Sequence, residues 1–333
     1  MNPGTYAGMF PGVVQQQGLR RQIPFTSSTN WIVPYTGFYY VYAIGGGGSG
    51  GTSDGSSNTG ASGGGAGGIT FKRAWLAAGT TIKIVIGAGG ASQTAGTGNG
   101  NDGGTTYVYG PGLNLVATGG TKGLNGNSIV GGTGGTGYGG DLNYTSGNGG
   151  AVTISAGFGA SGGGAVAFWG TAYNGGSVTV GPGGTSAAAS GGAGIGGNGY
   201  NTGANFGGTV TSAGGSALFA GPGDNAGSYP LKQNSAPNIA VTSDLLIPLG
   251  GSQTAYTQGP SSLGGGGDAE YGSAFAGSGY MGGGGGAVYN ASTTPIGGYG
   301  FLGGGGGACV TSGGTNTSGK GGSGFVVFTW LLQ

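Results

Sequence analysis

Glycine occupies 97 of the 333 positions of this chain, and this abundance constrains its fold more than any other feature. Glycine loses more conformational freedom on folding than any other residue, at a cost of roughly 0.5–1 kcal/mol relative to alanine. Such a chain is either a flexible linker or one that uses its missing side chains to bring backbones close together. Disordered segments combine few aromatic residues with high net charge. Here aromatic residues make up 10% and the net charge is +1, so we expect an ordered, structural protein.

The glycines gather in tracts with a partial three-residue period. The tracts span residues 45–48, 63–68, 131–140, 191–199, 264–267, 282–286 and 303–307. Collagen is excluded because it needs glycine at every third place and abundant proline, whereas this chain has 12 prolines and irregular spacing. Polyglycine-II rods have three residues per turn and no internal hydrogen bonds, so each rod must bond to its neighbours. We predict a hexagonally packed bundle of such rods. The alternative is a set of long surface loops.

Three runs of alternating apolar residues, at 38–44, 80–86 and 324–331, predict β-strands. The first and last are apolar on both faces, which is typical of central strands or of strands at a subunit interface. No stretch carries a helical apolar stripe of useful length. The predicted fold is all-β, with an antiparallel base or sandwich of N- and C-terminal strands and a glycine-rich body of polyglycine-II-like rods and long ordered loops. We expect residues 37–44 and 324–331 to share one sheet.

The same features suggest a division of the chain into four parts. These are an N-terminal arm and possible docking segment at 1–29, a β-rich base at 30–120, a glycine-rich body at 121–320, and a C-terminal strand at 321–333 that returns to the base sheet. One internal repeat is visible, because residues 279–288 and 300–310 share an apolar pair, five glycines and a short strand-like run. We predict that these two copies are neighbouring rods of one bundle.

The sequence offers little for catalysis or metal binding. It contains no histidine, which excludes Ser-His-Asp and Cys-His chemistry. Asp268 and Glu270 lie too close together along one strand to flank a glycosidic bond, and a solvated turn explains them better. Residues 98–104 resemble a single copy of a calcium-binding repeat, which needs tandem copies, so we predict a turn. Cys309 is the only cysteine and sits in an apolar run typical of a buried thiol. We expect no catalytic residue, cofactor or metal.

Charge and hydropathy narrow the possible partners. Charged residues make up 5% of the chain, and no basic face exists to follow phosphates, so nucleic-acid binding is not expected. No apolar run reaches the roughly 18–20 residues that a membrane span needs. The first 22 residues lack the basic and apolar regions of a secretory signal. A surface with so little charge favours association.

Tyrosine is the residue type best suited to recognition here. The chain has 17 tyrosines against 12 phenylalanines, and a tyrosine ring offers an apolar face with a polar tip that suits sugar rings or protein loops. Several stand among glycine or asparagine residues and are candidate receptor contacts: Tyr138, Tyr144, Tyr173, Tyr200, Tyr271, Tyr289 and Tyr299. The alternative is that they cap rods and fill gaps.

Three stretches together resemble the glycine-rich domain of bacteriophage tail-fibre and receptor-binding proteins. The first is FTSSTNWIVP at 25–34, followed by the strand to Ile44 and a glycine tract. The second joins GGITF at 67–71 to LAAGTTIKIVIGAGG at 76–90, and the third is GGSGFVVFTW at 321–330. The resemblance implies a β-structured base joined to a glycine-rich body on a virion appendage, usually trimeric, without catalytic residues. The long middle departs from the family pattern.

We therefore expect a structural virion protein of a phage tail fibre or spike that presents a host-contacting surface. Expected partners are a second and third copy of the chain, other virion proteins through residues 1–29, and a host surface glycan or outer-membrane protein. The expected subunit interface is the last strand: Phe325, Val326, Val327, Phe328, Trp330 and Leu331. The alternatives are an ice-binding protein with flat glycine-rich rods and a capsule polysaccharide depolymerase.

Overall fold

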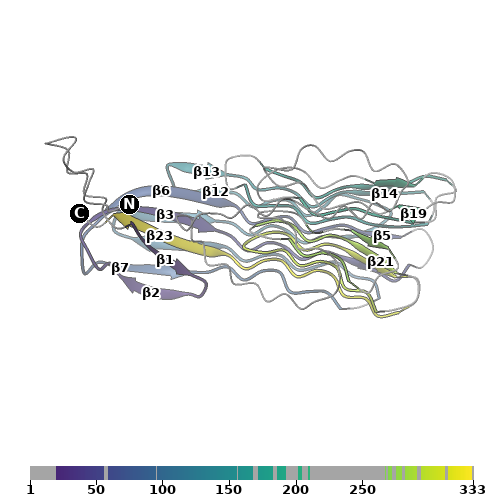
Figure 1. Cartoon of the computed structure of the whole chain (residues 1–333), viewed down its shortest axis with the longest axis horizontal. Helices are drawn as coiled ribbons and strands as arrows, with labels where there is room; N and C mark the ends of the chain where they lie inside the picture. The colour runs from purple at the N-terminus through teal and green to yellow at the C-terminus, as the bar shows by residue number, and fades with distance from the viewer. Residues whose placement is uncertain are drawn as a thin grey trace, which may run out of the picture.

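The fold is all-β, as predicted, and the molecule is elongated (Figure 1). The structure is a computed structural model that describes residues 20–55, 59–94, 96–155, 157–167, 172–182, 186–192, 202–204, 209–210, 267, 269–271, 275–279, 282–290, 294–311 and 314–331. These residues form strands, turns and extended rods, and no helix among them could cross a membrane. Two sheets lie at one pole, and rods run from them to short strands and turns at the other pole.

The two sheets at the first pole, which we call the base, pack against each other. The first has the order β1 (Arg20–Phe25), β23 (Phe325–Leu331), β3 (Gly37–Ile44), β6 (Ile69–Leu76) and β13 (Leu142–Tyr144). The second has the order β12 (Gly137–Tyr138), β9 (Leu113–Ala117), β8 (Thr106–Gly110), β7 (Thr81–Val85) and β2 (Thr29–Ile32). All neighbours within these two sheets are antiparallel.

The predicted pairing of the N- and C-terminal strands is confirmed. β23 lies antiparallel to β3, with Phe325 opposite Ile44 and Trp330 opposite Tyr39. On its other side β23 pairs with β1, whose residues 20–25 had been assigned to the N-terminal arm. The end of that arm is therefore a strand of the base.

The last strand does not offer the free face that the expected subunit interface requires. Val326, Phe328 and Trp330 are buried in the core between the two base sheets, where Trp31 contacts Phe328 and Tyr39 contacts Trp330. Phe325 and Val327, on the opposite face, are buried by the ends of rods that fold over the sheet. The chain itself thus covers both apolar faces of β23 along these five residues, which corrects the expectation that one face awaits a second copy. The side chain of Leu331, the sixth residue of the expected interface, lies outside the described residues.

The glycine tracts form the predicted bundle of rods. In the rod at 45–52, successive N–H groups donate in turn to the rods at 60–68, 98–104 and 316–322, so every third residue bonds to the same neighbour. Toward the rod at 60–68, the N–H groups of Gly45, Gly48 and Gly51 donate to the carbonyls of Gly68, Gly65 and Ser62, with N···O distances of 2.9, 2.9 and 3.0 Å. A period of three residues is the period of the polyglycine-II conformation.

The same rod accepts hydrogen bonds from three further neighbours. Gly120 and Gly123 donate to Gly46 and Ser49, Gly306 and Cys309 donate to Gly48 and Gly51, and Gly90 donates to Gly47. Six neighbours around one rod make the packing hexagonal. The glycine bundle is therefore confirmed, and it includes the rods at 45–52, 60–68 and 98–104 that the sequence division had placed within the base.

Glycine is required in these rods because neighbouring backbones occupy the place of a side chain. A Cβ added at Gly305 would overlap the carbonyl oxygen of Gly64, and one added at Gly64 would overlap that of Gly48. Gly37, at the start of β3, has no atom within 4 Å of such a Cβ. Close approach is thus a property of the bundle and not of every glycine.

At the far pole the rods end in short strands that belong to three small sheets (Figure 1). The first comprises β10 (Asn125–Gly126), β5 (Gly60–Ala61), β15 (Phe158–Ala160), β17 (Ser186–Ala188) and β19 (Thr209–Val210). The second comprises β11 (Ser128–Ile129), β14 (Val152–Ile154), β16 (Val178–Val180) and β18 (Thr202–Ala204). The third comprises β20 (Glu270–Tyr271), β21 (Val288–Asn290), β22 (Cys309–Thr311) and β4 (Thr52–Ser53).

The two copies of the internal repeat are neighbours, as predicted. β21 and β22 are parallel, with Val288 opposite Cys309. Upstream of them the N–H of Gly285 donates to the carbonyl of Gly305 at 2.9 Å. The repeat therefore marks two adjacent rods that leave the bundle in the same direction.

Candidate interaction surface

The candidate tyrosines lie in different parts of the molecule. Tyr138 in β12 of the base is exposed, and so is Tyr299 in the bundle. Tyr144 and Tyr173 are half-buried. Tyr289 is buried near the far pole, where it stacks on Phe158 with ring centroids 5.2 Å apart. Tyr200 and the side chain of Tyr271 lie outside the described residues. The described tyrosines of this set do not form one site.

A different group of aromatic side chains does gather, on the outer face of the first base sheet. β3 alternates so that Tyr39 and Val41 point into the core while Phe38, Tyr40 and Tyr42 point out. β6 lies beside it, and direct pairing places Trp75 opposite Phe38, Arg73 opposite Tyr40, and Phe71 opposite Tyr42. We call Phe38, Tyr40, Tyr42, Phe71 and Trp75, with Arg73 among them, the aromatic face.

The rings of the aromatic face contact one another. Phe38 and Trp75 meet edge to face with centroids 4.8 Å apart, and Tyr42 lies 4.6 Å from Phe71. Tyr40 and Phe71 are nearly parallel, with an interplanar angle of 13°. Such pairs stabilise each other by about 0.5–1.5 kcal/mol beyond the area they bury. The side chains are therefore held in a defined arrangement before any partner arrives.

One cation belongs to this face. The guanidinium carbon of Arg73 lies 4.0 Å from the centroid of the Phe38 ring. A cation over an aromatic ring is attracted by the negative charge at the ring face. The backbone N–H of Arg73 also donates to a carboxylate oxygen of Asp141 at 2.8 Å. Arg73 is thus fixed at both its backbone and its charged end.

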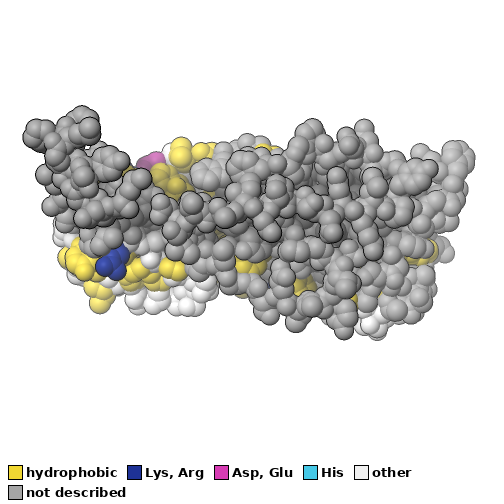
Figure 2. All heavy atoms as spheres, viewed as in Figure 1, with side chains coloured by type: hydrophobic (Ala, Val, Ile, Leu, Met, Phe, Trp, Pro, Cys, Tyr) yellow, Lys and Arg dark blue, Asp and Glu magenta, His cyan; other side chains and the backbone are white. Residues whose placement is uncertain are grey.

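The aromatic face is open to solvent. Trp75 is 58% exposed, Phe38 47%, Tyr40 37% and Tyr42 36%. The same surface of the sheet is covered closer to the bundle, where Ile44 and Ile69 are buried beneath Val166 and Ala167. Figure 2 shows other hydrophobic side chains next to a Lys or Arg at the base pole, where Figure 1 labels β1, β2 and β7. The aromatic face therefore continues a buried core past the point where the rods stop covering it.

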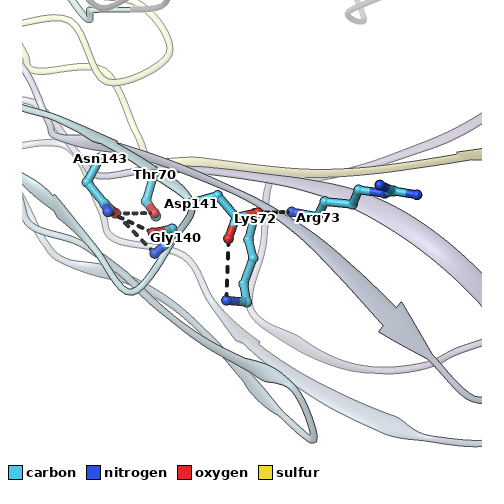
Figure 3. Close-up of polar contacts among 6 residues, drawn as sticks. All are labelled: Thr70, Lys72, Arg73, Gly140, Asp141 and Asn143. Atoms are coloured by element: carbon cyan, nitrogen blue, oxygen red, sulfur yellow. Dashed lines mark hydrogen bonds and ion pairs between the residues drawn. The ribbon is translucent and has the colours of Figure 1, made fainter.

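The edge of the sheet beside this face is closed by a turn (Figure 3). Asp141 lies 3.7 Å from the ammonium of Lys72 through its other carboxylate oxygen. The side-chain oxygen of Asn143 accepts hydrogen bonds from the Thr70 hydroxyl at 2.7 Å and from the Gly140 N–H at 3.1 Å. Because β13 is short, these side chains extend its hold on β6 beyond the strand pairing.

Polar side chains at the outside of the bundle accept hydrogen bonds from backbone N–H groups of the neighbouring rod. The carboxylate of Asp102 accepts the N–H of Lys122 at 2.8 Å, and Asn99 accepts that of Asn125 at 3.0 Å. These two acceptors stand three residues apart, which matches the period of the rod. The stretch that resembles a calcium-binding repeat is therefore part of a rod whose side chains bond to the next rod, and the predicted turn at 98–104 is wrong. In the part of the chain that the structure describes, no group of His, Cys, Asp or Glu side chains could hold a metal ion.

Cys309 is buried in the bundle, as its apolar setting predicts. Its thiol donates to the carbonyl oxygen of Pro295 at 3.2 Å. Burial raises the pKa of the Cys309 thiol to about 12, against the opposing effect of nearby backbone hydrogen bonds. A thiol with so high a pKa and no exposure is a packing residue and not a nucleophile.

Comparison with known proteins finds a family similarity for part of the chain. The sequence model of a family described as the glycine-rich domain matches residues 24–165. This span takes in most of the base strands and the first rods of the bundle. No curated protein matches the chain. The match supports the glycine-rich part of the resemblance found in the sequence.

Proposed function

We propose that this chain is a structural protein of a bacteriophage virion appendage, a tail fibre or spike, and that it holds a host-contacting surface away from its point of attachment. In this proposal the base joins the appendage, the bundle acts as a rigid spacer, and the far pole faces the host. The match of residues 24–165 to the glycine-rich domain is consistent with this role, and the order of strand motifs in the sequence supports it.

The observation that carries the proposal is the hydrogen bonding between rods along the length of the bundle. In the rod at 45–52 every residue donates its N–H to a main-chain carbonyl of a neighbouring rod, and rods bonded in this way run from the base to the far pole. A body held this way resists bending because any bend breaks bonds in several directions at once. The far pole carries bends between short strands, such as the one at Asn127 between β10 and β11, and such connections are where binding residues concentrate.

Attachment and assembly complete the proposal. Other virion proteins would contact the segment at 1–29, of which residues 20–25 are β1, an edge strand of the base. A host glycan or outer-membrane protein would contact the opposite pole. Copies of the chain would associate with one another. The few acidic side chains that the structure places, such as Asp102 and Asp141, accept backbone N–H groups, which suits a structural role.

Electron microscopy of phage particles tests this proposal directly. Antibodies raised against the purified chain and labelled with gold should decorate the ends of tail fibres or spikes on particles from the bacterium whose phage encodes the chain. Pre-incubation of host cells with the purified chain should also slow adsorption of those particles. Absence of gold from all particles, with the same antibody detecting the chain in the cell lysate, would contradict a virion role.

The sequence leaves ice binding as an alternative function, and the threonine side chains of the outer rods help to judge it. Thr118 and Thr121 stand three residues apart, as a flat threonine row requires. However, the Thr121 hydroxyl accepts the N–H of Thr133 at 2.6 Å and the Thr118 hydroxyl accepts that of Thr136 at 2.8 Å. These hydroxyls hold neighbouring rods of the bundle together, which favours the virion proposal over an ice-binding row. A thermal-hysteresis measurement that gave a gap between freezing and melting points would favour ice binding instead.

A further inference from the structure

We infer that Asn125, at the far pole, is the asparagine of the described Asn-Gly pairs that deamidates spontaneously in the folded chain, and that the bundle protects the same dipeptide in its rods. This inference goes beyond the function proposed above and does not depend on it. An Asn-Gly pair is especially prone to the reaction, because glycine has no Cβ to hinder the approach of its nitrogen to the asparagine side chain. The chain holds five such pairs, which begin at Asn99, Asn125, Asn148, Asn174 and Asn198. The last of them lies outside the described residues.

Deamidation of an Asn-Gly pair is a ring closure followed by hydrolysis. The backbone nitrogen of the glycine attacks the side-chain carbonyl carbon of the asparagine, and a new C–N bond forms. The side-chain nitrogen leaves as ammonia with the proton that the glycine nitrogen loses, and a succinimide remains. Water then opens one of the two imide C–N bonds to give aspartate or isoaspartate, and the proton of the new carboxyl group passes to the ammonia. The first step needs a side chain that can turn toward the glycine nitrogen and an N–H that base from the solvent can reach.

The rod at 145–151 denies both requirements to Asn148. The side-chain oxygen of Asn148 accepts the N–H of Gly134 at 2.8 Å, and the N–H of Gly149 donates to the carbonyl of Gly132 at 2.8 Å. One neighbouring rod therefore holds the side chain that would be attacked and the nitrogen that would attack it. Gly149 is also buried, although Asn148 is exposed.

Two more Asn-Gly pairs in the rods are held in the same way. The side-chain oxygen of Asn99 accepts the N–H of Asn125 at 3.0 Å, and the glycine after Asn99 donates to the carbonyl of Gly123 at 2.9 Å. Asn174 accepts the N–H of Asn148 at 2.8 Å, and the glycine after it donates to the carbonyl of Asn148 at 2.8 Å. The glycines of both pairs are buried: Gly100 and Gly175.

The pair at Asn125 and Gly126 is in a different setting. Asn99 engages only the backbone N–H of Asn125, and in the part of the chain that the structure describes no hydrogen bond holds the Asn125 side chain. Gly126 is half-exposed, where the glycines of the three rod pairs are buried. Its φ of 145° shows that the chain has left the rod conformation, whose φ is about −75°.

The cost of local opening favours the same site. Gly126 stands opposite Gly60 of β5, in a two-residue strand at the edge of its sheet. Such an edge opens locally at a small cost in free energy, whereas segments bonded on several sides open with the body of the protein. The rod that holds Asn148 exchanges main-chain hydrogen bonds with the rods at 60–68, 131–137, 160–167 and 172–178.

The product differs from Asn125 in charge and in backbone length. A carboxylate replaces the amide, so the formal net charge of +1 falls by one. In isoaspartate the main chain runs through the former side-chain carbonyl and is one carbon longer, which disturbs the pairing of Asn125 with Ala61. Because β10 is an edge strand, we expect this change to stay at the far pole and to leave the base intact.

Peptide mapping by mass spectrometry of the folded full chain tests the inference. The chain is incubated in mildly alkaline buffer made with heavy-oxygen water and digested in ordinary water, so that heavy oxygen marks only conversion before digestion. We expect the label at Asn125 to accumulate at least about tenfold faster than at Asn99, Asn148 and Asn174, because the rod pairs open only with the bundle. Equal rates at the four sites, or a faster rate at any rod site, would overturn the inference.

The same incubation in denaturant separates the fold from the local sequence. Without the rods, all four pairs should convert at rates within about threefold of one another, since the unfolded chain keeps only residual structure. At denaturant concentrations below the unfolding transition, the rate at Asn148 should rise with the unfolded fraction while that at Asn125 stays nearly constant. If Asn125 stayed the fastest by the same factor in the unfolded chain, its neighbours in sequence and not the fold would be the cause.

Asp102→Asn is a matched variant, because it creates a new Asn-Gly pair inside a rod. The Asp102 carboxylate accepts the N–H of Lys122 at 2.8 Å, and Gly103 donates to the carbonyl of Gly120 at 2.9 Å. An amide oxygen can accept the same bond. Gly103 is half-exposed, as Gly126 is, so the variant tests the hydrogen bonds apart from burial. We expect Asp102→Asn to convert as slowly as Asn99 in the folded chain, and conversion as fast as at Asn125 would show that these bonds do not protect.

Discussion

The base and the glycine bundle achieve order by opposite means. In the base, large side chains such as Phe328 and Trp31 fill the space between two sheets, with ring centroids 4.5 Å apart. In the bundle, side chains are absent at the points of contact, and backbone N–H and C=O groups of one rod meet those of the next. The base is therefore sensitive to the loss of volume, and the bundle to its addition. This contrast explains how a chain with 97 glycines folds at all.

The two regions depend on each other through β23, and removing it should have the largest effect. Deletion of residues 324–333 takes the strand that lies between β1 and β3, together with side chains from two cores. We expect loss of the base and, with it, of the anchored ends of the rods. Circular dichroism and size-exclusion chromatography of the truncated chain should show an unfolded or aggregated product. A truncated chain that stays compact with an intact bundle would show that the two regions fold independently.

A single methyl group in the bundle should be nearly as damaging. In Gly305→Ala the new Cβ would overlap the main-chain carbonyl of Gly64, which cannot move aside as the end of a flexible side chain can. We expect a loss of more than about 4 kcal/mol in the free energy of unfolding, the range reserved for severe core disruption. Denaturant unfolding measures it. Gly37→Ala is the control, since nothing lies within 4 Å of its Cβ, and it should change stability by less than about 1 kcal/mol.

The base should be destabilised by the loss of side-chain volume, whereas the bundle is destabilised by its addition. Phe328 is fully buried and contacts Phe25, Trp31 and Tyr39. Phe328→Ala should lower the free energy of unfolding by about 3–5 kcal/mol, because it leaves a cavity. Ile82→Leu, which conserves volume in the same core, should cost less than about 1.5 kcal/mol. If the two variants had the same small effect, side-chain packing would not be what holds the base.

Alkaline pH should lower the free energy of unfolding through Cys309, by less than the substitutions above. Burial raises the pKa of the Cys309 thiol in the bundle to about 12 from its ordinary value of 9.0. Above pH 9 the unfolded chain releases this proton while the folded chain keeps it, so the free energy of unfolding should fall as pH rises toward 12. The slope from this one group approaches about 1.4 kcal/mol per pH unit. Cys309→Ala should remove that part of the slope, and an unchanged slope would mean that the thiol titrates normally in the folded state.

Sequence reasoning found the elements of the fold better than it found the candidate surface. The period-two pattern at 38–44 and 324–331 predicts strands, and the period-three pattern of the tracts favours rods over loops, so the strands, their pairing and the rods were predictable. The sequence did not predict that the outer face of β3 is exposed at Phe38, Tyr40 and Tyr42. That exposure depends on where the cover by Val166 and Ala167 ends on the sheet. The tyrosines were chosen for their glycine neighbours, and that setting does not bring them together. The alternation of Phe38, Tyr40 and Tyr42 was the signal that marks the aromatic face.

Native-state hydrogen exchange of the glycine amides tests the central claim most directly. If rods are held by backbone bonds on all sides, the amides of the interior rods at 45–52, 60–68 and 303–309 should exchange as slowly as those of β3 and β23, within about tenfold, because both open only with the global unfolding of the molecule. Amides of Tyr35 and Thr36, in the exposed turn between β2 and β3, supply the fast reference within the same sample. Protection confined to the base, with rod amides exchanging as fast as that turn, would contradict the account.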